Sequence, residues 1–223
     1  MLPLKQKVKN IVIINKKKKK MNFLAHIYLS GENDQVKVGN FIGDYVKGKQ
    51  YTNYPADIRK GILLHRYIDS FTDRNEIPRK LKPLLKPTYN RYAGIVIDLF
   101  YDHFLANNWG YFSEIQLEDF INGFYNCLRE NFSLLPERVQ NFVPHMIYHN
   151  RLQSYIEIEG LRQALVIMSR TTSLPDKTNE AIKVLKNNYN EFNDNFLEFF
   201  PNLIKYVNQY YSIDLQYSFD SQL

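Results

Sequence analysis

The chain of 223 residues contains only one cysteine, Cys127, and no long apolar run. A single cysteine excludes an internal disulfide framework and suits a reducing compartment. A bilayer-spanning helix needs ~20 predominantly apolar residues. The most apolar stretch, residues 92–106, is shorter and includes Asp98, Asp102 and His103. We therefore expect a soluble, cytoplasmic protein without a membrane span.

Several catalytic motifs are also missing from the sequence. The chain has no G-x-S-x-G nucleophile elbow, no P-loop and no dinucleotide-binding glycine pattern. Cys127 has no histidine close to it in the sequence. His145 and His149 lie four residues apart, but no glutamate follows the first of them, as a zinc metalloprotease requires. We interpret this histidine pair as a feature of a helix surface.

Acidic residues are absent from residues 1–20, and this tail accounts for the net charge of +6. Removing its eight lysines from the 29 basic residues leaves 21, against 23 acidic residues in the rest of the chain. The run Lys16–Lys20 is typical of a solvated segment. We expect a disordered extension over residues 1–20, with Met21 as the functional start. Binding of RNA or a membrane surface by this tail is the alternative.

Apolar residues recur at a helical period through most of the remaining sequence, and alternating strand patterns are few. The sequence predicts an all-α single domain, a helical bundle over residues 21–211, followed by a C-terminal tail, 212–223. The predicted helical segments are 55–72, 88–109, 114–131, 136–152, 160–170 and a long amphipathic run over 178–211, bent or interrupted at Pro201.

Polar residues recur at four-residue spacing on these apolar segments, which places them on one helix face. They are His26, the pair Asn40 and Asp44, the triplet His65, Asp69 and Asp73, and the pair Asp98 and Asp102. A buried carboxylate without a partner costs several kcal/mol. Facing helices that supply histidines and carboxylates build metal sites in bundles. Salt bridges to Arg59, Arg66 or Arg91 are the alternative explanation.

Five sequence blocks together resemble the acyl carrier protein phosphodiesterase family, in the order in which the family has them. They are "MNFLAHIYLS", "GNFIGDYVKG", "GILLHRYIDSFTD", "YAGIVIDLFYDHFLANNW" and "MSR" at 168–170, and the resemblance runs from Met21 to about Pro201. Each block alone is weak, whereas all five in order are specific. Met21 also falls where family members begin.

This resemblance implies an activity. Family members hydrolyse the phosphodiester that joins 4′-phosphopantetheine to a serine of holo-acyl carrier protein, which leaves apo-carrier. They need a divalent cation, with Mn²⁺ favoured and Mg²⁺ or Fe²⁺ as alternatives, and are considered distorted relatives of HD-domain phosphohydrolases. The resemblance therefore implies an HD-domain-like bundle. No His-Asp dipeptide occurs here, and Asp102-His103 runs in the reverse order, so the HD ligand rule cannot be copied by position.

A divalent ion lowers the pKa of bound water and neutralises phosphoryl charge, so it fits this reaction. Our hypothesis places His65, Asp69 and Asp102 in the ligand core, with His26 and Asp44 completing it or holding a second ion. Asp73 and Asp98 then orient ligands or carry a water. The predicted general acid is His103, and the predicted phosphate clamp is Arg66 or Arg170.

The implied partner is acyl carrier protein, which is small and acidic, so electrostatic steering would favour a basic surface on this chain. Basic residues cluster between positions 47 and 86, and an ordinary solvated helix face is the alternative explanation for them. Three other functions stay open. They are a metal-dependent phosphohydrolase of nucleotides or other small phosphodiesters, a non-catalytic helical binding protein, and RNA binding through the lysine tail. We expect no nucleic-acid partner.

Overall fold

Every regular element that the structure assigns between residues 22 and 217 is helical, which confirms the predicted all-α class. The computed structural model describes residues 22–217, so the predicted extension 1–20 lies outside the described residues. The α-helices of this range are α1 (Phe23–Tyr28), α2 (Asp34–Phe41), α3 (Ala56–Arg74), α4 (Glu76–Tyr89), α5 (Ala93–Asn107), α6 (Leu117–Glu130), α7 (Glu137–Tyr148), α8 (Ile158–Thr171), α9 (Thr178–Asn187) and α10 (Tyr189–Tyr211). Short 3₁₀ turns join several of them, and η1 (Gly43–Tyr45) and η6 (Gln153–Ile156) take part in the sites below.

Several helix boundaries differ from the sequence prediction, and two of the differences have a visible local cause. The predicted segment 88–109 contains a break, because α4 ends at Tyr89 and the next residue, Asn90, has a positive φ of 45° that does not continue a helix. The long run 178–211 is interrupted at Asn188, between α9 and α10, while Pro201 lies inside α10. The Asn188 side chain donates to the Val184 carbonyl and thereby satisfies a group at the end of α9.

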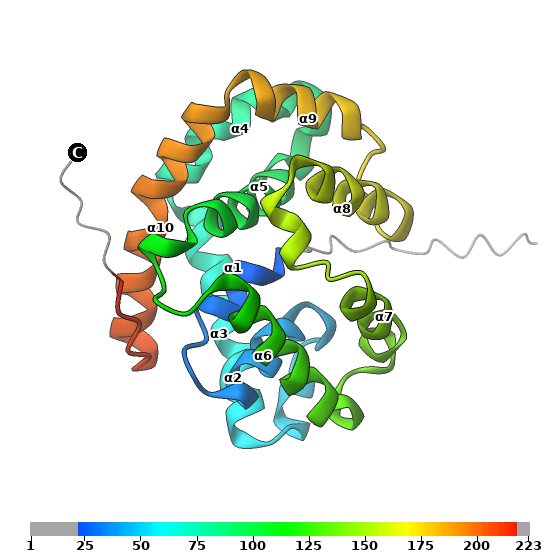
Figure 1. Cartoon of the computed structure of the whole chain (residues 1–223), viewed down its shortest axis with the longest axis vertical. Coiled ribbons are helices and arrows are strands. Elements are labelled where there is room, and N and C mark those ends of the chain that lie inside the picture. Colours follow the sequence, from blue (N-terminus) through cyan, green and yellow to red (C-terminus); the bar gives the residue numbers. More distant parts are fainter. Residues whose placement is uncertain (1–21, 218–223) are drawn as a thin grey trace, which may run out of the picture.

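Helix α5 lies in the interior and contacts α1, α4, α8 and α10. Its residues from Ile95 to Ala106 are all buried, so the helix is enclosed around its whole circumference, as expected of a central helix. Figure 1 shows α1 near the middle of the molecule, with α2, α3 and α6 on one side of it and α5 on the other. The short helix α1 is therefore held between two groups of longer helices.

Helix α10 covers one side of this arrangement (Figure 1), and its buried residues include Phe192, Phe196, Phe199 and Phe200. Phe192 meets Phe100 of α5 edge to face at 5.3 Å between ring centroids, and Phe200 lies 5.7 Å from Tyr28 of α1. Burial of one such side chain stabilises the fold by about 1.5–3 kcal/mol. Within residues 22–217, no helix combines the length and the apolar character needed to cross a membrane.

Candidate metal centre

Two glycines let α2 and α3 cross at close range. A Cβ atom on Gly39 would lie 2.1 Å from the Ile58 carbonyl oxygen, and one on Gly61 would lie 2.2 Å from that of Val36. Real Cβ atoms do not approach backbone that closely, so any other residue would push the helices apart. This close packing brings Asn40, at the end of α2, against His65 on α3.

His26 of α1 and His65 of α3 meet at this crossing. Their rings stack with centroids 4.2 Å apart and an angle of 21° between the planes. Their Nε2 atoms lie 3.5 and 3.6 Å from the carboxylate oxygens of Asp69, and the Nε2 of His65 is also 3.5 Å from Asp44 in η1. His26, His65 and Asp69 offer ligand atoms that all lie within 4.8 Å of one another. Four of the predicted metal ligands are therefore brought together by the fold.

Asn40 holds both imidazoles in one tautomer. Its side-chain nitrogen donates to the carbonyl of His26 (2.7 Å) and to the hydroxyl of Ser30, which fixes the orientation of its amide. The amide oxygen of Asn40 therefore faces Nδ1 of His26 at 2.8 Å, and its backbone oxygen faces Nδ1 of His65 at 2.9 Å. Because both oxygens can only accept, each Nδ1 carries a proton. In a neutral ring, Nε2 then has the lone pair that a metal needs.

The spacing of these atoms fits a divalent cation. Ligand atoms that lie ~2.1 Å from one ion are roughly 3.0–3.4 Å apart in octahedral or tetrahedral geometry. The observed separations of 3.5–3.6 Å are close to this range and exceed those of a direct charge-assisted hydrogen bond. The donor set, two imidazoles and two carboxylates, suits Mn, Fe or Zn. These residues can therefore hold a divalent metal ion.

Asp102, a predicted ligand, is placed differently by the structure. It is fully buried in α5, and its two oxygens accept the backbone N–H groups of Leu24 (3.0 Å) and Ala25 (2.9 Å). Burial raises the pKa of the Asp102 carboxyl, and these two donors oppose that rise. A carboxylate at a helix N-terminus satisfies orphan donors. Asp102 therefore anchors α1, and through α1 it positions His26.

His103 also has structural partners. Its Nδ1 donates to the carbonyl of Tyr155 in η6 at 2.8 Å, and its Nε2 lies 2.9 Å from the hydroxyl of Tyr189 in α10. Burial lowers the pKa of His103, which favours the neutral ring in this network. Asp98, one turn before Asp102 on α5, is likewise buried. The structure thus brings His103 to Tyr155 and Tyr189, and the group of His26, His65 and Asp69 does not include it.

The predicted phosphate clamps differ in their surroundings. Arg66 donates to the carbonyls of Val46 and Gly48, at 3.0 and 2.8 Å, and so fastens the segment that follows Asp44. Arg170 is exposed in the last turn of α8. Asp73, one turn beyond Asp69 on α3, is also exposed. Arg66 therefore acts on the site through the backbone beside Asp44.

The sequence indicated that Asn40 lies on an apolar face but gave it no role. Its position four residues before Asp44 was the available signal. Gly43 carried no signal at all, although a Cβ on Gly43 would lie 2.2 Å from Cγ of His65. Both residues position the histidines. Asn40 contacts their Nδ1 atoms, and Gly43 leaves room for the ring of His65.

Fold and site together define an all-α protein with a candidate metal centre of two histidines and two aspartates. The family model for acyl carrier protein phosphodiesterase matches residues 21–203. The chain belongs to this family. Relatives named acyl carrier protein phosphodiesterase include that of Enterobacter sp. (strain 638), 29% identical over 82% of this chain and 96% of the relative. The relative from Pectobacterium atrosepticum is 28% identical over 83% of this chain and 96% of its own length.

No solved structure matches this chain. The relation to HD-domain phosphohydrolases, implied by the sequence resemblance, therefore stays a prediction.

Proposed function

We propose that this chain is a metal-dependent phosphodiesterase that hydrolyses the bond between 4′-phosphopantetheine and the carrier serine of holo-acyl carrier protein. Water is added across that bond, so the products are apo-carrier, with a free serine hydroxyl, and 4′-phosphopantetheine. The family and the names of the relatives support the substrate. The observation that carries the chemistry is the convergence of His26, His65 and Asp69.

The proposed ligand set is His26, His65 and Asp69, with Asp44 as the fourth member. Two carboxylates balance the charge of a dication, and the two Nε2 atoms complete a mixed nitrogen and oxygen set. When bound, a divalent cation offsets the negative charge of a phosphodiester and lowers the pKa of water. We favour Mn²⁺, with Mg²⁺ and Fe²⁺ as alternatives.

The other residues of the proposal act through these four. Asn40 fixes the proton on each Nδ1. Asp102 holds the N-terminus of α1 and therefore the position of His26 along that helix. Arg66 fastens the segment after Asp44. The proposed ligand set omits Asp102, because it lies outside the converging group of His26, His65 and Asp69, and its oxygens accept N–H groups at the start of α1.

Lys47 and Lys49 lie shortly after Asp44 in the chain and suit an acidic partner. Lys47 and Lys49 are exposed, as are Arg74, Arg79, Lys80 and Lys86 of the basic cluster that the sequence predicted. Complementary charge accelerates encounter and loses strength as salt increases. We propose that an acidic carrier approaches this surface, in the cytoplasm, where the single cysteine stays reduced.

The test is to incubate the purified chain with holo-acyl carrier protein and MnCl₂ and to weigh the carrier by mass spectrometry. We expect the carrier to lose the mass of phosphopantetheine, and EDTA to stop the loss. Hydrolysis in H₂¹⁸O should place the label in phosphopantetheine rather than in the serine. An unchanged carrier, in an assay where nucleotides or other small diesters are cleaved, would replace this proposal by the small-diester alternative.

A further inference from the structure

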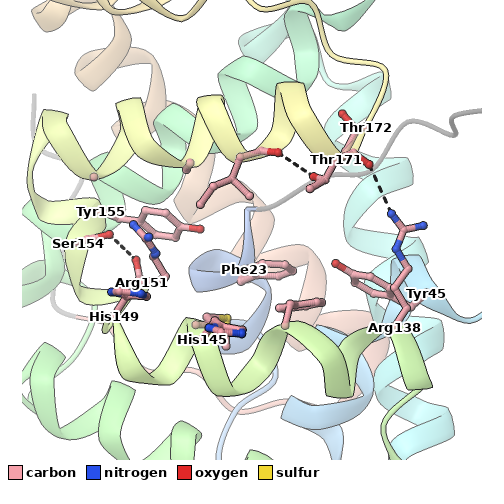
Figure 2. A pocket seen from close by; sticks show the side chains of 15 residues that line it. Phe23, Tyr45, Arg138, His145, His149, Arg151, Ser154, Tyr155, Thr171 and Thr172 are labelled. Atoms are coloured by element: carbon pink, nitrogen blue, oxygen red, sulfur yellow. Dashed lines mark hydrogen bonds between the residues drawn. The ribbon is translucent and has the colours of Figure 1, made fainter.

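A cavity of about 260 Å³ lies between α7 and α8, beside the N-terminus of α1. Figure 2 shows it with α8 along one wall, α7 along the other, and Phe23 of α1 between them. Phe23, Phe142, Met146, Ala164 and Ile167 make most of its lining apolar. A concave apolar site with a few polar groups is the usual form of a small-molecule site.

Two arginines and two histidines border the cavity. They are Arg138, His145, His149 and Arg151, and the residues that line the cavity include no aspartate or glutamate. Arg138 donates to the Thr171 carbonyl at 3.4 Å, and Arg151 donates to the Gln163 side chain, so each arginine ties the α7 side to α8. The cavity therefore combines an apolar interior with positive charge at its borders, which complements a ligand that has an uncharged body and an anionic end.

Two tyrosines connect this cavity to the metal centre. Tyr45 lines the cavity and directly follows Asp44 in η1. The Tyr45 ring packs against Phe142 of α7 with 5.6 Å between centroids, and Figure 2 shows Tyr45 beside Arg138 at one end of the cavity. Tyr155 also lines the cavity. Burial raises the pKa of its hydroxyl, and the charge of Asp102 adds to that rise. The inner wall of the cavity is thus shared with residues that adjoin the site.

We propose that this cavity between α7 and α8 receives the pantetheine arm of the substrate. The inference rests on the proposed function, which places the phosphate at the metal centre. The arm is a slender, uncharged chain with a gem-dimethyl group, two amides and a terminal thiol. Its apolar parts match Phe142, Met146 and Ile167, and its amides can bond the hydroxyls of Tyr45 and Tyr155, which Figure 2 shows directed toward the cavity. A folded carrier is too large to enter such a cavity, whereas the arm is not.

The test fills the cavity by the substitution Ile167→Trp, with Ile115→Trp as the matched control. Ile167 lines the cavity and is partly exposed, so a larger side chain can be accepted without unfolding, while Ile115 is 58% exposed outside this cavity. We expect kcat/KM for holo-carrier to fall at least about ten-fold in Ile167→Trp, since a displaced arm forfeits its binding energy. Hydrolysis of bis(p-nitrophenyl) phosphate should be unchanged in both variants.

A binding measurement separates this inference from the proposed function. Pantetheine without its phosphate, titrated by calorimetry, should bind the unchanged chain and Ile115→Trp but not Ile167→Trp. That binding result supports the cavity assignment even if the chain does not hydrolyse holo-carrier. Failure to hydrolyse holo-carrier would overturn only the proposed function. Absence of pantetheine binding to the unchanged chain, or equal turnover of holo-carrier by Ile167→Trp, would overturn the assignment of the cavity.

Discussion

The imidazoles of His26 and His65 stack 4.2 Å apart, and both present Nε2 to Asp69. Because oxygens of Asn40 face both Nδ1 atoms, a neutral ring at either position turns the lone pair of Nε2 toward Asp69. Neutral imidazole is the form that binds a metal. The arrangement is thus prepared for a cation by the packing of α1 on α3.

The substitution Asp69→Asn should weaken metal binding. It keeps the shape of the side chain but removes the negative charge that faces both Nε2 atoms. We expect the affinity for Mn²⁺ to fall roughly 100-fold, measured by calorimetric titration, together with turnover of holo-carrier. Asp194→Asn, an exposed position on α10, is the matched control and should leave both unchanged. Full Mn²⁺ affinity in Asp69→Asn would remove Asp69 from the ligand set.

The substitution Asn40→Ala should separate positioning from general stability. The side-chain oxygen of Asn40 contacts Nδ1 of His26, so Asn40→Ala frees the tautomer of that ring and should reduce metal affinity roughly 10–100-fold, while the backbone oxygen at position 40 still contacts Nδ1 of His65. The control is Asn195→Ala, because Asn195 is also buried and bonded, to Tyr101 and to the Ile77 carbonyl. Thermal unfolding should show losses in both variants, whereas only Asn40→Ala should change Mn²⁺ binding. An equal effect on the metal in both would show that stability alone is responsible.

A methyl group on Gly43 should displace His65. The Cβ atom would lie 2.2 Å from Cγ of the ring, so Gly43→Ala forces the imidazole away from Asp44 and Asp69. Overpacking of this kind costs about 1–3 kcal/mol, and we expect metal-dependent turnover to be lost as well. Gly123→Ala is the control, since nothing lies within 4 Å of its Cβ and the site is exposed in α6. That variant should be more stable by ~1 kcal/mol, because alanine favours a helix.

Cys127 should be unreactive in the folded chain. Burial, with the neighbouring Asp34 carboxylate, raises the pKa of its thiol to about 12, and only 5% of the residue is exposed. At pH 8 we expect no reaction with Ellman's reagent until denaturant is added. Because folding raises this pKa, the protonated thiol contributes to the free energy of unfolding. That contribution is complete below the ordinary pKa of 9.0 and declines as the pH rises toward about 12. Rapid labelling at pH 8 without denaturant would contradict this placement of the thiol.

Salt should weaken the encounter with an acidic carrier. If the exposed lysines after Asp44 form part of the docking surface, the KM for holo-carrier should rise several-fold between low and physiological ionic strength, as screening predicts. The kcat should change little, because the proposed metal ligands are partly or fully buried. Bis(p-nitrophenyl) phosphate serves as the comparison substrate, since it lacks the acidic protein. A KM for holo-carrier that is independent of salt would count against this surface.

The sequence by itself determined the helical class and a set of candidate residues that includes those of the candidate centre. Apolar period and proline position predicted α3 nearly to its ends, since Pro55 precedes Ala56 and the helix follows the predicted segment 55–72. Four-residue spacing placed His65 and Asp69 on one face because an α-helix fixes that geometry locally. The five quoted blocks also led to the family that the comparison shows.

Only the tertiary structure decided which of these residues meet. Local spacing treats Asp69 and Asp102 alike, yet Asp69 faces two imidazoles while Asp102 accepts two N–H groups from α1. The difference comes from how α1 is packed between α3 and α5. The two hydrogen bonds of Asp102 join residues that are separated by 77 and 78 positions in the sequence, and such distant contacts leave no periodic signal in the chain. The roles of Asn40 and Gly43 depend on the same packing, because each acts on a ring that another helix supplies.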